Sequence, residues 1–226
     1  MAAEPILTIR RDFPRPSLEI LAAFEGVSSS MICDAQKRVG ALHHTVKPVT
    51  TRCRFVGPAL TVSAGPKDNL ASYAALKVAK RGDVIVIANG GFDGCAAVGD
   101  IYVGMARNAG AAGCVTDGMA RDVPGIEEVG IPVFARGITP NSPFKNGPGT
   151  VGLPISVGGV AVHPGDIVFA DEDGVVVVPL ASVERVLPVL ARVKAKEVEM
   201  SAWVEGGATT PEWLDDTLAG PDVEWL

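Results

Sequence analysis

The sequence predicts a single α/β domain, and three observations lead to that fold class. Helical and strand patterns alternate through the middle of the chain, which predicts parallel strands joined by crossover helices. The part that follows is rich in short apolar runs separated by glycine, proline and aspartate turns, which predicts a second β layer. The composition of the 226 residues, 47% of them hydrophobic with Gly 26 and Pro 17, is typical of one core with many short connections.

Two short helices open the predicted domain. Between residues 17 and 24 apolar side chains recur at helical spacing, and Ser28, Ser29 and Ser30 are capping residues ahead of a second helix that begins at Met31. Residues 56–63 are rich in β-branched side chains and predict a strand. Residues 69–80 have the alanine, leucine and lysine content of an amphipathic helix.

The middle of the chain then alternates between strands and helices. Gly82 and Asp83 form a turn into residues 84–88, an unbroken apolar run typical of a strand that is covered on both faces. After a glycine-rich loop, the remaining patterns predict a helix over 101–108, a strand over 113–116, a helical turn over 125–128 and a strand over 132–135.

Short strands and one long helix complete the predicted domain. Turn residues separate four apolar runs, which predict strands over 155–157, 160–162, 167–169 and 175–178. Residues 182–204 form the longest helical pattern, with a kink expected at Pro188, and the polar tail is expected to dock on a neighbour or to fray. We expect one domain over 1–226, with N-terminal helices over about 17–40, a core over about 41–180 and a C-terminal helix and tail over about 181–226.

The charge balance excludes one large class of partners. Lys and Arg number 20 against 26 Asp and Glu, a formal net charge of −6, and no stretch combines basic residues with interleaved aromatic ones. Nucleic acid is therefore not an expected ligand. Residues 1–16 lack the apolar segment of a signal peptide, and no apolar run approaches the roughly 18 residues of a membrane span, so we expect a soluble, cytoplasmic protein without membrane contact.

The cysteines do not suggest a disulfide framework or a zinc site. No two of them form a Cys-x-x-Cys pair, and a core of this size needs no covalent staples. We therefore expect reduced thiols at Cys33, Cys53, Cys95 and Cys114.

The stretch 99–122 is the most informative part of the sequence. It begins with a loop that enters a helix and ends just beyond a buried strand, and in open α/β sheets ligands bind beyond the carboxyl ends of strands. Unpaired backbone N–H groups of Ile101 and Tyr102 at the helix start would attract a carboxylate or an enolate oxygen. Arg121 could grip a carboxylate with two parallel hydrogen bonds.

Two aspartates in the same stretch suit a divalent cation. Asp122 and Asp100 supply hard oxygen ligands, and one or two carboxylates with several waters are the usual way to hold Mg²⁺ or Mn²⁺ while leaving positions free for substrate. Taken alone, an Arg-Asp pair in a loop is more often a surface salt bridge or a helix cap than a catalytic pair.

The spacing of Asp100, Arg121 and Asp122 resembles the D-x20-R-D motif of a known family. That family contains the regulator of ribonuclease E activity, RraA, and the class II pyruvate aldolases acting on 4-hydroxy-4-methyl-2-oxoglutarate and 4-carboxy-4-hydroxy-2-oxoadipate. The resemblance covers about residues 25 to 200. Its further signatures are Asp34-Ala35, 57–62, Asn69, 82–84, Gly113 with Asp117-Gly118, 132–137, 164–171 and 174–179.

The resemblance implies a fold and an assembly. The fold is an RraA-like α/β sandwich with a central mixed sheet, helices packed on it and a long C-terminal helix. The assembly is a homotrimer or a hexamer made of two trimers, with the site near a subunit boundary. In the aldolases a glutamate on the C-terminal helix of the adjacent subunit completes the water shell of the metal. Glu197 resembles that residue, with Glu199 as the alternative, although beside Lys194 and Lys196 both also suit a solvated helix face.

The resemblance also implies roles for the motif residues. Asp122 resembles the direct metal ligand and Asp100 the residue that holds a metal-bound water. Arg121 resembles the residue that binds the 2-oxo acid and stabilises its enolate. The backbone that would contact substrate belongs to Gly99, Ile101 and Tyr102.

This constellation suits a carbon–carbon lyase. A 2-oxo acid can chelate a cation through its carboxylate and keto oxygens, so that the charge of an enolate develops beside the dication. Retro-aldol cleavage of 4-hydroxy-4-methyl-2-oxoglutarate-type substrates, which releases pyruvate, and decarboxylation of oxaloacetate share this enolate. Neither requires a Schiff-base lysine. A metal-bound water held by Asp100 would take the proton of the C4 hydroxyl group.

One position departs from the aldolase pattern. The aldolases commonly carry Glu or Asp three residues after the R-D pair, where this chain has Gly125, and Glu127 and Glu128 are out of register. Aldol cleavage and oxaloacetate decarboxylation therefore both stay open. The alternative function is that of a non-catalytic regulator that binds ribonuclease E, as RraA does. Methyl transfer to demethylmenaquinone, a label long attached to this family, finds no supporting nucleotide-binding signature.

Other features are better explained by structure than by chemistry. The G-x-G-x-x-G pattern over 147–152 is not followed by a helix, which a dinucleotide site needs. The acidic stretch 171–174 lacks the other EF-hand ligands and predicts a hairpin turn. The three histidines are too scattered for zinc. Trp203, Trp213 and Trp225 suggest tail docking or contacts between subunits.

Overall fold

A nine-stranded mixed sheet forms the centre of the protein. The computed structural model describes residues 5–225. Four parallel strands lie side by side in the middle of the sheet: β3 (Phe55–Ser63), β4 (Val84–Ala88), β6 (Gly113–Thr116) and β8 (Val133–Ala135). The remaining strands are β1 (Leu7–Ile9), β2 (Lys47–Pro48), β10 (Gly149–Val151), β13 (Ile167–Asp171) and β14 (Gly174–Val178).

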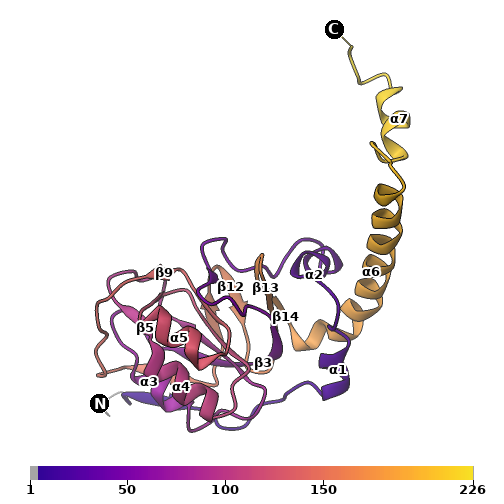
Figure 1. Cartoon of the computed structure of the whole chain (residues 1–226). Helices are drawn as coiled ribbons and strands as arrows, with labels where there is room; N and C mark the ends of the chain where they lie inside the picture. The colour runs from indigo at the N-terminus through magenta and orange to yellow at the C-terminus, as the bar shows by residue number, and fades with distance from the viewer. Residues whose placement is uncertain (1–4, 226) are drawn as a thin grey trace.

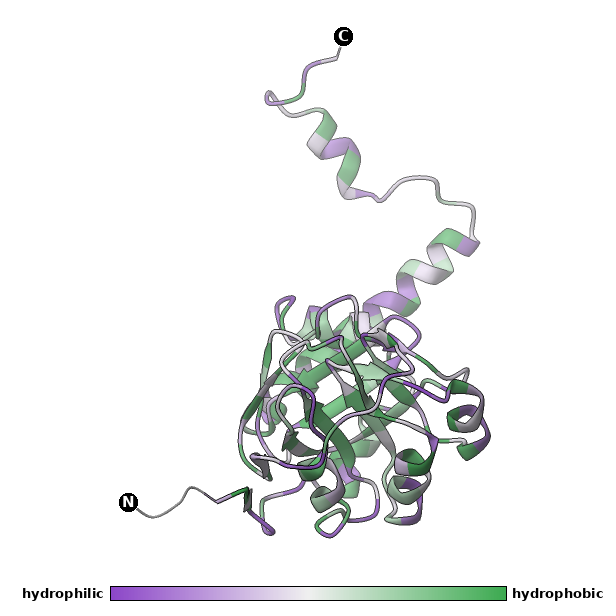
Figure 2. Ribbon diagram, turned by 90° about the vertical axis from the view of Figure 1, so that its left-hand side faces the viewer, coloured by the Kyte–Doolittle hydropathy of each residue, from purple (hydrophilic) through white to green (hydrophobic). Residues whose placement is uncertain are grey.

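The long strand β3 joins the two parts of this sheet. Its first half pairs antiparallel with β13, and its second half pairs parallel with β4 and antiparallel with β10. Most residues of β3 and all those of β4 are buried, which explains their nearly continuous apolar sequences. Figure 2 shows the hydrophobic strands gathered inside the body.

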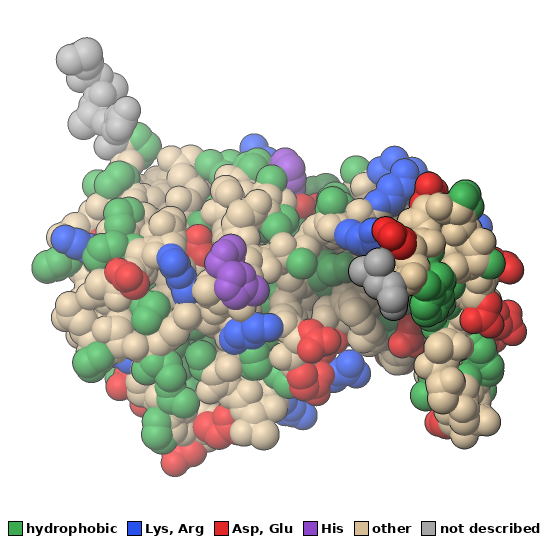
Figure 3. All heavy atoms as spheres, turned by 90° about the horizontal axis from the view of Figure 1, so that it is seen from above, with side chains coloured by type: hydrophobic (Ala, Val, Ile, Leu, Met, Phe, Trp, Pro, Cys, Tyr) green, Lys and Arg blue, Asp and Glu red, His purple; other side chains and the backbone are tan. Residues whose placement is uncertain are grey.

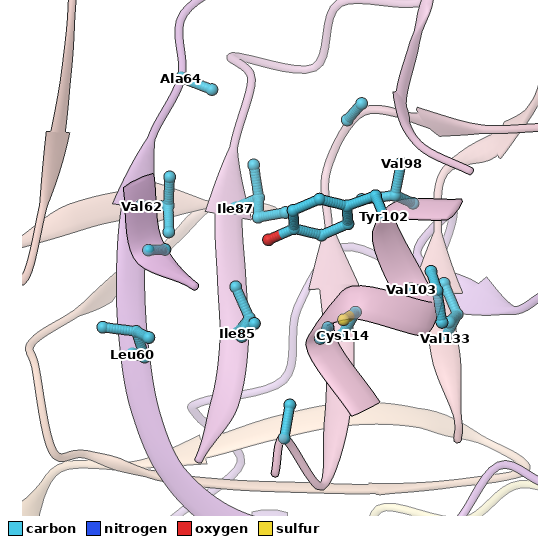
Figure 4. Close-up of a cluster of buried hydrophobic side chains, with 14 of the residues drawn as sticks. Leu60, Val62, Ala64, Ile85, Ile87, Val98, Tyr102, Val103, Cys114 and Val133 are labelled. Carbon is cyan, nitrogen blue, oxygen red and sulfur yellow. The ribbon is translucent and has the colours of Figure 1, made fainter. Parts of the chain in front are cut away.

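Helices cover the sheet in two groups. The first group, α3 (Leu70–Ala75), α4 (Asp100–Asn108) and α5 (Val123–Val129), buries a cluster around Tyr102, which Figure 4 shows lying against Ile87. The second group packs near the β13–β14 hairpin and consists of α1 (Leu18–Ala22), α2 (Ser29–Ala35), η1 (Leu180–Ser182) and the start of α6 (Val183–Glu205). Figure 1 shows α6 projecting from the body and carrying α7 (Trp213–Leu218) beyond its tip.

A small parallel sheet continues three of the central strands. After short breaks, β4, β6 and β8 are followed by β5 (Ala96–Val98), β7 (Met119–Ala120) and β9 (Gly137–Ile138), which pair in the order β5–β7–β9. These strands are not predictable from the sequence, because two or three residues show no periodicity. They position the candidate site.

Most of the predicted elements are present. The predicted strands 84–88 and 113–116 coincide with β4 and β6, and those over 155–157 and 160–162 with β11 (Ile155–Val157) and β12 (Val160–Val162). The helix predicted over 69–80 is wrong in length. After Ala75 the chain tightens into turns whose N–H groups bond to carbonyls three residues back, so α3 has only six residues. The polar tail forms the unpredicted helix α7.

A buried ion pair ties the N-terminal segment to the sheet. Arg15 donates two hydrogen bonds of 2.8 Å from Nε and Nη2 to the carboxylate of Asp83, whose side chain is 0% exposed. The N–H of Lys80 donates to the same carboxylate at 2.9 Å. Because every contact of this buried charge comes from a fixed donor, the pair contributes strongly to the position of residues 5–16.

The cysteines and the helices of residues 5–225 bear on two further expectations from the sequence. No disulfide joins the four cysteines; Cys33 is half-buried, and Cys53, Cys95 and Cys114 are buried. Of the helices in this part of the chain, none combines the length and the apolar character that a membrane crossing requires.

Candidate active site

The short sheet brings the two ends of the sequence motif together. β5 and β7 run parallel, and the N–H of Arg121 donates to the carbonyl of Val98 at 3.1 Å. Gly99 and Asp100 therefore leave β5 beside the point where Arg121 and Asp122 leave β7. The site lies beyond the carboxyl ends of parallel strands, as expected, but these strands belong to the small sheet and not directly to β6.

Two glycines allow α4 and α5 to begin in close contact. A Cβ atom on Gly99 would lie 2.8 Å from Oδ2 of Asp122 and 3.2 Å from Nε of Arg121. A Cβ atom on Gly125 would lie 2.7 Å from Oδ2 of Asp100. Each acidic side chain therefore packs against a glycine of the opposite segment, which fixes where both carboxylates lie.

Arg121 is held by two acceptors. Its Nε lies 3.0 Å from Oδ2 of Asp122, and its Nη1 donates to Oγ of Ser142 at 2.5 Å. The Arg121 side chain is 33% exposed, so the guanidinium remains accessible at the mouth of the site. Two fixed contacts on one face leave the remaining N–H groups free to bind a carboxylate.

The backbone of Asp122 is in the left-handed region. With φ 57° and ψ 41°, Asp122 precedes α5 as its N-cap, yet its side chain makes no capping hydrogen bond. A non-glycine residue in this conformation costs about 1 kcal/mol or more. The carboxylate, 44% exposed, is directed to Arg121 instead of to the helix. Such strain is typical of functional positions.

The start of α4 differs from the prediction in one respect. The N–H of Ile101, expected to be unpaired, donates to Oδ1 of its neighbour Asp100 at 2.6 Å. Among the described residues, the N–H of Tyr102 donates no hydrogen bond. The Tyr102 side chain does not face the site. Its hydroxyl donates to the Ser72 carbonyl in the core, and burial raises the pKa of this phenol well above its ordinary value of 10.0.

A cavity of about 90 Å³ is lined by Asp100 and Arg121, together with the backbone around Gly99. Its walls also include four residues outside the sequence motif: Asn69, Tyr73, Ser142 and Lys145. Asn69 is 5% exposed and its Oδ1 has no hydrogen-bond partner. A buried acceptor without a partner beside a cavity is a group that a ligand or a water can satisfy. The sequence marks Asn69 only as part of the family resemblance, and Ser142 and Lys145 come from a loop without a recognisable pattern.

The acidic residues fit a hydrated divalent cation. Within residues 5–225, no three Asp, Glu, His or Cys side chains lie close enough to hold a metal ion alone. Mg²⁺ and Mn²⁺ bind well to one or two carboxylates completed by waters and substrate oxygens. Asp122, partly exposed, and Asp100, whose Oδ2 makes no hydrogen bond to the described residues, match that requirement.

Glu197 lies far from this cavity within one chain. It is exposed on α6, and Figure 1 shows α6 on the side of the body opposite to α4 and α5. Any contact between Glu197 or Glu199 and a site must therefore involve a second chain.

The structural explanations for the other motifs are supported. The stretch 147–152 runs into β10 and not into a helix. Residues 171–174 close the β13–β14 hairpin, with Asp171 paired to Gly174. Oγ of Ser28 accepts from the N–H of Met31 and caps α2.

Comparison with known proteins finds a family model that matches the chain and relatives with similar sequences. The family model RraA-like, described as Aldolase/RraA, matches residues 29–177. A Halalkalibacterium halodurans protein provisionally named 4-hydroxy-4-methyl-2-oxoglutarate aldolase is 39% identical over 170 residues, which cover 75% of this chain and 81% of the relative.

Solved structures share the fold. An uncharacterised protein from Pseudomonas syringae pv. tomato superposes with a TM-score of 0.76 at 27% identity, covering 87% of this chain and 97% of the other. Streptomyces coelicolor RraAS2, described as an unusual member of the RNase ES inhibitor RraA protein family, superposes with a TM-score of 0.71 at 29% identity, covering 84% and 100%. The mixed sheet, the D-x20-R-D constellation and these similarities agree, and the chain belongs to the RraA-like family.

Proposed function

We propose that this protein is a divalent-metal-dependent lyase that cleaves a carbon–carbon bond next to a 2-oxo acid group. The observation that carries the proposal is that Asp100 and Arg121 line one small cavity, with the carboxylate of Asp122 beside it, 3.0 Å from Nε of Arg121. The family contains aldolases by name, and a relative at 39% identity is provisionally named as one. The reaction we propose is retro-aldol cleavage of a 4-hydroxy-4-methyl-2-oxoglutarate-type substrate with release of pyruvate, decarboxylation of oxaloacetate, or both.

Asp122 and Asp100 are the residues that would hold Mg²⁺ or Mn²⁺, Asp122 directly and Asp100 through a water. When bound, the cation supplies a Lewis acid that lowers the free energy of negative charge on a substrate oxygen by several kcal/mol. Asp100 keeps Oδ2 free because its Oδ1 accepts from the N–H of Ile101. That oxygen can hold a water or accept a proton.

Arg121 and the first turn of α4 would orient the 2-oxo acid. The guanidinium can bind the substrate carboxylate with two hydrogen bonds, since its position is fixed by Asp122 and Ser142. The free N–H of Tyr102 adds a donor with the positive end of the helix dipole behind it. Together these donors favour the enolate, in which negative charge develops on the keto oxygen.

Lys145 gives the cavity a second cation. It lines the wall with Asn69 and Tyr73, and its Nζ lies 5.7 Å from the centre of the Tyr73 ring. The substrates named above carry a second carboxylate in addition to the one beside the keto group. Arg121 and Lys145 can therefore bind one carboxylate each, which favours a dicarboxylate over pyruvate alone.

Gly125 leaves the choice between the two reactions open. The acidic residue common at this position in aldolases would place its Cβ against Asp100. In this chain the Asp100 side chain occupies that space, so no additional carboxylate flanks it from α5. The proton transfer that aldol cleavage requires would then depend on Asp100 alone.

We propose that the active form is a homotrimer or a hexamer. Glu197 or Glu199 of a neighbouring chain would contribute the third acidic group, which a single chain lacks within residues 5–225. Comparing Glu197→Gln with Glu199→Gln tests this assignment. The variant of the contributing residue should lower metal affinity, whereas the other should match wild type, and equal affinity in all three proteins would contradict it.

The central experiment measures metal binding and turnover in one pair of variants. The chelated protein is titrated with MgCl₂ or MnCl₂ by calorimetry, and pyruvate release is followed from 4-hydroxy-4-methyl-2-oxoglutarate and from oxaloacetate. Asp122→Asn should abolish metal uptake and lower turnover by at least about 1,000-fold, given several kcal/mol of lost charge stabilisation. Glu128→Gln, which removes an exposed carboxylate of the same helix α5, should change neither. Full turnover in Asp122→Asn, or no metal uptake by wild type, would exclude the proposal.

A second candidate function is regulation of ribonuclease E by direct binding. It is supported by the similarity to RraAS2, which is described as belonging to an RNase ES inhibitor family. Addition of the purified protein to a ribonuclease E cleavage assay tests it. Inhibition that persists in Asp122→Asn would support a regulator independent of catalysis, and unchanged RNA cleavage would exclude it.

A further inference from the structure

A large groove lies on the opposite side of the molecule from the candidate active site. It has a volume of about 660 Å³ and lies between α2, the β11–β12 turn and the first turns of α6. Its walls are mainly apolar, and Val39 at its rim is 62% exposed. The charged residues in its walls are Lys37 and Arg185, and none of the described residues that line it is acidic. The groove therefore suits an apolar segment with negative charge.

The C-terminal tail of this chain has those properties. Residues 205–225 contain six acidic residues and no Lys, Arg or His. α7 presents Trp213, Leu214 and Leu218 together with Asp215 and Asp216, and Trp213 is 64% exposed. Figures 1 and 3 show this arm standing away from the body, with acidic side chains in red along it. A short amphipathic helix of this kind can place its apolar face in a groove.

Return of the tail to the groove of its own chain requires an almost fully extended linker. The helix from Val189, the groove residue nearest to the tip of α6, to Glu205 is about 24 Å long. The eight Cα–Cα steps from Glu205 to Trp213 reach at most about 29 Å when fully extended. A return along the same chain would therefore leave the linker little conformational freedom, whereas docking on a second copy does not impose this constraint.

We propose that the C-terminal tail of one chain docks in this groove on a second copy. Trp213, Leu214 and Leu218 would fill the apolar part, while Asp215 and Asp216 would lie opposite Arg185 and Lys37. Gly206 and Gly207, the latter at φ 93°, form the joint that lets α7 turn relative to α6. This contact is independent of the proposed chemistry, because it involves none of the candidate active-site residues.

Cross-linking between two differently tagged, co-expressed chains tests the proposal. Both chains carry Cys33→Ser, since the other native cysteines are buried. One chain also carries Thr217→Cys in α7 and the other Val39→Cys at the rim of the groove. A short bismaleimide should join them into a product that carries both tags. Replacing Val39→Cys with Lys77→Cys, an exposed position in the turn after α3, should give no product.

Charge reversal then tests the specificity of the contact. Arg185→Glu, or Lys37→Glu if the first variant does not fold, should lower the yield at least fivefold, and combining it with Asp215→Lys and Asp216→Lys should restore it. The proposal is overturned if no mixed product forms, if Lys77→Cys reacts equally well, or if charge reversal has no effect. A cross-link formed within a single chain that carries both cysteines would equally overturn it, in favour of an intramolecular tail.

Discussion

Replacing Gly99 with alanine should separate the activity of the site from the stability of the fold. The φ of Gly99 is −146°, which any residue adopts, so the backbone does not require glycine. The new methyl group, however, would lie 2.8 Å from Oδ2 of Asp122 and 3.2 Å from Nε of Arg121. Both side chains are partly exposed and can move aside, and they would carry the candidate metal ligand and the carboxylate-binding group with them.

The expected magnitude follows from this geometry. A methyl group at 2.8 Å forces a shift of several tenths of an ångström to 1 Å, and a misplacement of about 1 Å can cost on the order of 100-fold in rate. Stability should not fall, because alanine reduces the conformational entropy of the unfolded chain and contributes about 0.4–1 kcal/mol in a compatible conformation.

Gly104→Ala is the matched control on the same helix. A Cβ there meets nothing nearer than Cγ2 of Val129 at 3.8 Å. This variant should keep wild-type turnover and stabilise α4 by about 0.5–1 kcal/mol. The assay pairs pyruvate release with urea unfolding of both variants. If Gly99→Ala retains full turnover and metal affinity, contact of Gly99 with Asp122 and Arg121 does not matter for function and the assigned site is wrong.

Three further predictions concern stability and substrate binding. Arg15→Ala leaves the buried Asp83 carboxylate without its partner and should cost about 3–5 kcal/mol in urea unfolding. Arg107→Ala removes an exposed arginine of α4 that forms no ion pair with the described residues, and it should cost at most about 1 kcal/mol; equal costs would refute this. Burial raises the pKa of the Cys114 thiol from 9.0 to about 12. This difference between the unfolded and folded states contributes about 4 kcal/mol to the free energy of unfolding below pH 9, and the contribution is lost as the pH rises towards 12. Cys114→Ala should therefore flatten the fall in unfolding free energy between pH 9 and 12, and a parallel pH profile would contradict it. Lys145→Ala should raise KM for a dicarboxylic 2-oxo acid about tenfold or more in steady-state assays, with kcat nearly unchanged, and an unaltered KM would remove Lys145 from substrate binding.

The elements that were predictable from the sequence are those with a strong local signal. The buried strand β4 is an unbroken apolar run bounded by a turn and a glycine-rich loop, and its predicted limits coincide with the observed ones. Ser28 is a strong N-cap residue, and it marks the start of α2, where its side chain accepts a capping hydrogen bond. By contrast, the strands β5, β7 and β9 are stabilised by pairing with one another, and nothing within two or three residues reveals that pairing.

The candidate site, too, was only partly predictable from the sequence. Asp100, Arg121 and Asp122 were recognisable because their spacing resembles a family motif, and physical reasoning alone left a surface ion pair as the commoner explanation. Asn69 and Lys145 reach the cavity from loops that long-range hydrogen bonds hold in place. No periodicity or spacing connects such residues with the motif, so only the folded chain identifies them.

The loop between β9 and β10 has a consequence for how the cavity can vary. Replacements in the segment 139–146, which contributes Ser142, Pro143 and Lys145 to the cavity wall, would alter that wall while Asp100 and Asp122 stay at the starts of α4 and α5. Substrate choice and the chemical centre can thus diverge separately in evolution, because different stretches of backbone determine them. A scaffold of this kind can acquire a new substrate without rebuilding its reactive groups, or lose its substrate and keep them.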